Sequence, residues 1–63
     1  MWCVVHKGYI YNRIETVNDV ANLVYRLTND WQFAKYLRGY LPSKEVDWEE
    51  DFEEQIIFIW RYK

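Results

Sequence analysis

The segment Gln55-Ile56-Ile57-Phe58-Ile59-Trp60-Arg61-Tyr62 contains an uninterrupted run of five apolar residues, Ile56 to Trp60, and we infer that the other elements fold against it. Its β-branched and aromatic residues are typical of a strand. Because side chains alternate across a sheet, one face holds Ile56, Phe58, Trp60 and Tyr62, and the other holds Ile57, Ile59 and Arg61. A strand that is apolar on both faces needs cover on both, either from the rest of the chain or from a second molecule.

A competing interpretation treats the same residues as the end of a helix. Trp48, Phe52, Ile56 and Ile59 also match helical spacing, which would continue a helix from the preceding acidic residues through Trp60. We favour a strand after Glu54, because β-branched and aromatic residues become dense there and apolar side chains occur on all sides.

The size and composition of the chain predict one small domain, residues 1–63, that needs additional stabilisation. A chain of 63 residues buries only about 60% of the surface that its unfolded form exposes. The single cysteine, Cys3, excludes an internal disulfide, and no Cys/His cluster suggests a metal or another cofactor. Hydrophobic residues make up 51% of the chain and aromatic residues 21%, so packing and association remain as the means of stabilisation.

Charge is unevenly distributed along the chain. Residues 1–44 carry six basic and three acidic side chains, whereas residues 45–63 carry seven acidic and two basic ones, for a total net charge of −2. No segment resembles a signal peptide or a membrane-spanning helix, and we therefore expect a cytoplasmic protein.

The N-terminal residues predict a β-hairpin, in which Lys7-Gly8 forms the turn between Trp2–His6 and Tyr9–Ile14. A two-residue loop pairs His6 with Tyr9 and gives the hairpin two different faces. One face is mainly aliphatic and holds Met1, Cys3, Val5, Ile10, Asn12 and Ile14. The other is aromatic and partly cationic and holds Trp2, Val4, His6, Tyr9, Tyr11 and Arg13.

Two helices are predicted after the hairpin. Thr16 and Asp19 have the spacing of a capping box, and an apolar stripe at helical spacing follows, made of Val17, Val20, Ala21, Val24 and Leu27. A second helix runs from Trp31 to about Arg38, with Phe33, Ala34 and Leu37 inside and Gly39 as its C-cap. A short third helix or turn starts at Asp47. The predicted fold is α+β, with a three-stranded antiparallel sheet of order 2-1-3 and the helices on its aliphatic face.

The seven acidic residues after Lys44 are the first candidate site: Glu45, Asp47, Glu49, Glu50, Asp51, Glu53 and Glu54. The simplest interpretation is a solvated helix face, and the functional one is recognition of a basic partner protein. Acid–base catalysis would need carboxylates with different pKa values, and nothing in the sequence separates them. The lone histidine, His6, has no nucleophilic motif beside it, so we do not expect an enzyme.

The aromatic residues are the second candidate site. Trp2, Tyr9, Tyr11 and Arg13, together with Phe58 and Trp60, are predicted to be buried in a homodimer, since such residues dominate interfaces. Cover from within the chain by Trp48 and Phe52 is an alternative. Trp2, Tyr9, Tyr11, Lys7 and Arg13 would also suit a module that binds single-stranded nucleic acid.

These patterns favour a small non-enzymatic protein-binding module that acts as an inhibitor or adaptor. Compact inhibitors encoded by phages or mobile elements have this size and character.

Overall fold

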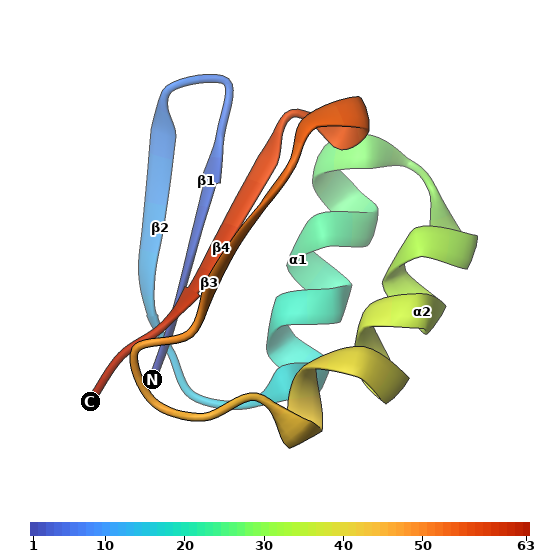
Figure 1. Ribbon diagram of the computed structural model, residues 1–63. Coiled ribbons are helices and arrows are strands. Elements are labelled where there is room, and N and C mark those ends of the chain that lie inside the picture. Colours follow the sequence, from blue (N-terminus) through green and yellow to red (C-terminus); the bar gives the residue numbers. More distant parts are fainter.

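The computed structural model describes residues 1–63, and it places two helices on one face of a four-stranded antiparallel sheet (Figure 1). The strands are β1 (Trp2–His6), β2 (Tyr9–Ile14), β3 (Glu49–Phe52) and β4 (Ile57–Arg61), and the helices are α1 (Val17–Thr28) and α2 (Trp31–Tyr40). Short 3₁₀ turns, Leu41–Ser43 and Glu53–Gln55, precede β3 and β4. The order of strands across the sheet is β2-β1-β4-β3, so β2 and β3 form its edges.

The N-terminal hairpin forms as predicted, with His6 paired with Tyr9 and Val4 with Tyr11. Lys7 and Gly8 both have positive φ, 50° and 84°, which is the turn geometry that matches the twist of a two-residue hairpin. A bulge interrupts the pairing farther along, where Arg13 has φ 59° and Ile14 pairs with Trp2. The extra residue moves Ile14 from its predicted face to the face of Trp2.

Both helices begin at the predicted residues. The Thr16 side chain accepts a hydrogen bond from the Asp19 amide at 3.1 Å, and Asp30 does the same for Phe33 at 3.0 Å. The predicted end of the second helix is wrong, because Gly39 lies inside α2 and Leu41 is the C-cap. No helix combines the length and the apolar character that crossing a membrane would require.

The acidic segment forms a strand, so the predicted three-stranded sheet and the predicted helix from Asp47 are both wrong. Glu49–Phe52 pairs antiparallel with β4, with Glu50 opposite Ile59 and Phe52 opposite Ile57. Acidic residues have low strand propensity, but pairing with the apolar β4 supplies hydrogen bonds that outweigh this preference. Ile56 has φ 57° in the connection, and β4 therefore starts at Ile57 rather than at Gln55.

The helices cover the sheet face opposite to the one predicted. The core cluster consists of Trp2, Val4, Val20, Val24, Leu37, Leu41, Ile57 and Ile59, each no more than 3% exposed. β4 determines this outcome, because its register puts Ile57 and Ile59 beside His6 and Val4, and Phe58 beside Val5. The hairpin taken alone has its aliphatic side chains on the other face, which is why the prediction failed.

Candidate functional site

The strands β3 and β4 form a C-terminal hairpin, and its acidic residues lie on both faces of the sheet. Glu49 and Asp51 share the outer sheet face with Trp60 and Phe58, their cross-strand partners. Glu50 lies on the helix-covered face, where its Oε1 accepts a hydrogen bond of 2.6 Å from the Tyr40 hydroxyl. The predicted helix would have placed these carboxylates on one solvated surface, whereas the strand divides them between two faces.

The Tyr40–Glu50 hydrogen bond has an electrostatic consequence. It raises the pKa of Tyr40 to about 12, and desolvation and the negative charge of Glu50 act in the same direction. The Lys44 ammonium lies 4.1 Å from the centre of the Tyr40 ring, and the Tyr36 ring stacks on Tyr40 with centroids 4.9 Å apart. Tyr40 is thus held by a hydrogen bond, a stacked ring and a cation.

Four carboxylates surround a small pocket next to this tyrosine. Its volume is about 280 Å³, and its lining residues are Phe33, Glu50, Asp51, Phe52, Glu53, Glu54 and Gln55. The Phe33 and Phe52 rings meet edge to face, with centroids 5.3 Å apart. Gln55 is fixed by a 2.9 Å hydrogen bond to Oδ2 of Asp30. Aromatic rings beside carboxylates suit the aliphatic stem and the charged end of a lysine or arginine.

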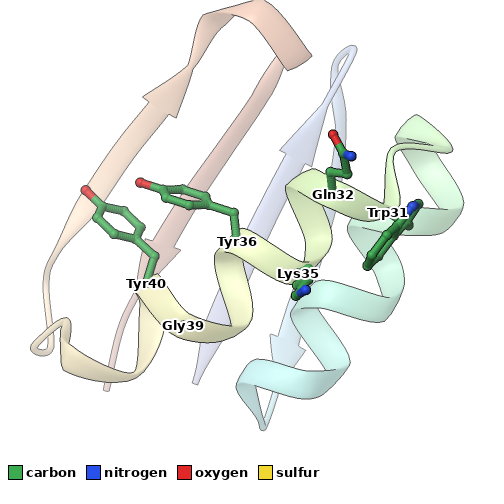
Figure 2. A pocket seen from close by; sticks show the side chains of 6 residues that line it. All are labelled: Trp31, Gln32, Lys35, Tyr36, Gly39 and Tyr40. Carbon is green, nitrogen blue, oxygen red and sulfur yellow. The ribbon is translucent and has the colours of Figure 1, made fainter.

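A larger groove of about 580 Å³ lies along the outer side of α2, lined by Trp31, Gln32, Lys35, Tyr36, Gly39 and Tyr40 (Figure 2). Trp31 is 55% and Tyr36 51% exposed, which is high for such large apolar groups. Figure 2 shows Tyr36 and Tyr40 side by side on the helix, with Trp31 near its beginning. At Gly39 an added Cβ would have no neighbour within 4 Å, so the absence of a side chain leaves this part of the groove open.

This groove was not predicted from the sequence. Its only local signal is the spacing of Trp31, Lys35 and Tyr36, which fall on the side of the helix opposite the inner stripe, whereas Tyr40 lies at the edge of that stripe and packs against the core. A stripe of this kind does not show whether another part of the chain covers it. That information comes from the packing of α2 against the C-terminal hairpin.

The groove and the acidic pocket adjoin each other. Phe33 lines the pocket and stacks on Tyr36 of the groove, with ring centroids 6.3 Å apart. Tyr40 lines the groove and donates its hydrogen bond to Glu50 of the pocket. We call the two together the α2–hairpin surface. It consists of Trp31, Lys35, Tyr36 and Tyr40 from the groove, and of Phe33, Glu50, Asp51, Phe52, Glu53 and Glu54 from the pocket.

The residues of the predicted aromatic face are not gathered on one surface. Trp2 is 3% exposed beneath the helices, and Tyr11 packs against the same core. Tyr9 is exposed, and Arg13 is exposed at the bulge. Phe58 and Trp60 are partly buried on the opposite sheet face. Burial of Trp2 in the core leaves the hairpin without the continuous stacking platform that the nucleic-acid interpretation used.

Cys3 is buried as predicted, but on the sheet face away from the helices. It is 7% exposed, and burial raises the pKa of its thiol. The Tyr62 hydroxyl accepts a 2.8 Å hydrogen bond from the Arg13 amide, and its ring lies 5.0 Å from that of Trp60. Because Tyr62 follows β4 and Arg13 is in β2, the Tyr62 side chain spans the end of β1 that contains Cys3.

The remaining predicted site residues lie apart from these surfaces. Glu45 and Asp47 are exposed in the connection that leads to β3. His6 is buried on the helix-covered face, whereas Cys3 faces the other way. The structure contains no group of three or more His, Cys, Asp or Glu side chains arranged to hold a metal ion.

Comparison with protein-family models, with curated proteins and with solved structures finds no match to this chain.

Proposed function

We propose that this protein is a small non-enzymatic binding module that docks a basic segment of another protein on the α2–hairpin surface. The observation that carries the proposal is the junction at Tyr40, where an exposed aromatic groove is joined to a pocket lined by four carboxylates. Interfaces gain most of their affinity from Trp and Tyr side chains in hollows, and charge complementarity adds specificity and speed of association.

Each part of the surface has a distinct role in this proposal. A lysine or arginine of the partner places its stem on Phe33 and Phe52 and its charge beside Glu53 and Glu54. The adjoining apolar residues of the partner lie between Trp31 and Tyr36 in the groove. Such a module acts by occupying its partner's surface, which is how an inhibitor or adaptor works.

The proposal is tested by capture from native lysate followed by measurement with the purified partner. The double variant Glu53→Gln/Glu54→Gln removes two pocket charges, and the variant Tyr36→Ala removes one groove wall. Glu15→Gln is the charge control, since Glu15 is exposed between β2 and α1. We expect the wild type and Glu15→Gln to capture the same protein with similar affinity. Both surface variants should bind that protein at least about tenfold more weakly.

The salt dependence of binding and a titration with nucleic acid complete the test. Binding through the carboxylates should weaken as salt rises, and less so in the double variant. Equal affinity of all variants for the captured protein would place its contact elsewhere and overturn the proposal. A labelled single-stranded oligonucleotide that binds at about 150 mM salt, and is lost in Tyr9→Ala and Tyr11→Ala, would favour nucleic acid instead.

A further inference from the structure

No helix covers the sheet face away from α1 and α2 (Figure 1), and only the Tyr62 side chain crosses it, beside Cys3 at one end of β1. Val5, Phe58 and Trp60 are partly exposed there, and Ile10 is 67% exposed. We call these four residues the bare sheet face. Antiparallel sheets can expose one face to water, but that face is then usually polar, and contiguous apolar patches mark sites of association.

The pairing register arranges this face in two rows that run across the sheet. In the first row Ile10, Val5, Phe58 and Asp51 follow one another from β2 to β3. In the second row Cys3 of β1 pairs with Trp60 of β4, and Trp60 pairs with Glu49 of β3. On the other side of Cys3 lies the bulge of β2 at Arg13. Each row therefore has an apolar centre and an acidic end on β3, and the second row has a cationic residue at its β2 end.

We propose that a second copy of this chain covers the bare sheet face, in a two-fold dimer whose axis runs parallel to the strands. A rotation about that axis exchanges the two edges of the sheet but keeps the position along the strands. Glu49, at one end of the second row, then lies over Arg13 of the partner, at the other end. By symmetry this opposite-charge pair occurs twice. In the other row Val5 of each copy lies over Phe58 of its partner and Ile10 over Asp51, as in packed sheets about 10 Å apart.

Other arrangements of two copies are less favourable. A two-fold axis across the strands would place β3 over β3 and bring Glu49 and Asp51 of both copies together. Pairing of two β3 edges would align the same acidic strands, and charged edge strands oppose such contacts. The proposed dimer leaves the groove along α2 free, because the helices lie on the other side of the sheet (Figure 1), and of the α2–hairpin surface it covers Asp51 alone. It does not depend on the proposed function.

The test uses charge reversal on the purified protein, with sedimentation equilibrium from about 1 to 100 μM as the readout. Arg13→Glu and Glu49→Arg should each raise the dimer dissociation constant about tenfold or more. The double variant Arg13→Glu/Glu49→Arg restores both opposite-charge pairs and should recover most of the lost affinity. Circular dichroism of each variant shows that the monomer fold is kept.

An apolar-to-charged change tests the centre of the face. Ile10→Asp should abolish the dimer, because it places a second carboxylate opposite Asp51 of the partner, and it should not unfold the monomer, because Ile10 is 67% exposed. Tyr25→Asp on α1, at a residue that is 44% exposed, is the matched control and should leave the dimer unchanged. A wild type that is monomeric at about 100 μM, or a dimer that tolerates Ile10→Asp, would overturn the proposal. Failure of the double charge reversal to restore the dimer would rule out the proposed axis.

Discussion

The Tyr40 hydroxyl donates a 2.6 Å hydrogen bond to Oε1 of Glu50, and this contact joins α2 to the edge strand β3. The two residues are ten positions apart and belong to elements of different type, yet they form the boundary between the groove and the acidic pocket. Glu50 is the one carboxylate of β3 that lies on the helix-covered face, and Tyr40 provides its partner there. The bond explains how an acidic strand packs beside two helices.

The titration of Tyr40 tests this bond. The pKa of Tyr40 is raised from 10.0 to about 12, so the folded state holds the proton more tightly than the unfolded state does. The stabilisation from this group is fully present below about pH 10 and is lost as the pH rises to about 12. In urea unfolding, the stability difference between wild type and Tyr40→Phe should shrink over that range.

Glu50→Gln provides the control for this titration. Removing the carboxylate takes away the largest cause of the shift, so the late tyrosinate absorbance should move back toward pH 10. Tyr40→Phe should remove that late component altogether. A tyrosinate titration that is identical in wild type and Glu50→Gln would contradict the contact.

The face assignment of β4 predicts a large effect at Ile59. This side chain is fully buried between Val4 and Glu50 in the sheet and belongs to the core cluster. Ile59→Ala should lower the free energy of unfolding by about 2–5 kcal/mol, because it removes buried methyl groups and leaves a cavity. Val46→Ala, at a site that is 48% exposed, should change it by less than about 0.5 kcal/mol. Chemical denaturation gives both values, and similar effects at the two sites would be inconsistent with this core.

The backbone at Ile56 predicts a stabilising substitution. Ile56 has φ 57° and ψ 42°, a left-handed conformation that is costly for a β-branched residue, and its side chain is 55% exposed. Ile56→Asn should raise the unfolding free energy by up to about 1 kcal/mol, since asparagine tolerates this conformation. Ile56→Thr is polar but keeps the β-branch and should bring no gain. Thermal unfolding of the two variants distinguishes relief of strain from a change in surface polarity.

Thr16 and Asp19 provide a test of the helix start. The Thr16 hydroxyl accepts the 3.1 Å hydrogen bond from the Asp19 amide at the first turn of α1. Thr16→Ala should cost about 1 kcal/mol of unfolding free energy, because one amide at the helix end loses its partner. Thr16→Ser keeps the hydroxyl and should restore most of that loss. Urea denaturation measures both, and equal stability of the alanine and serine variants would show that the cap contributes nothing.

The position of Tyr62 predicts how Cys3 reacts. Burial raises the pKa of the thiol and limits its contact with solvent, so labelling by a thiol reagent under native conditions should be slow. Tyr62→Ala removes the side chain that spans this end of β1 and should accelerate labelling about tenfold or more, by increasing exposure. Tyr9→Ala, at a residue that is 70% exposed near the hairpin turn, should leave the rate unchanged. Rapid labelling of the wild type would contradict the burial of Cys3.

Local sequence determines the N-terminal hairpin, both helix starts and the alternation of side chains along β4. Each of these depends on residues that are close together in the sequence, such as Lys7 and Gly8 at the hairpin or Thr16 and Asp19 at the helix. The energies involved are those of turns, caps and strand propensity, and they depend on neighbouring residues alone. The sequence also marks the acidic residues as a group, although it does not show their geometry.

Tertiary structure alone decides the strand at Glu49–Phe52, the side on which the helices pack, and the surface that joins Tyr40 to Glu50. The acidic strand exists because β4 provides hydrogen-bonding partners that outweigh its own low strand propensity. The helices lie over Trp2 and Val4 because β4 adds Ile57 and Ile59 to that face, and a local pattern in the hairpin cannot include them. These features depend on contacts between residues far apart in the chain, which form only when the whole sheet is assembled.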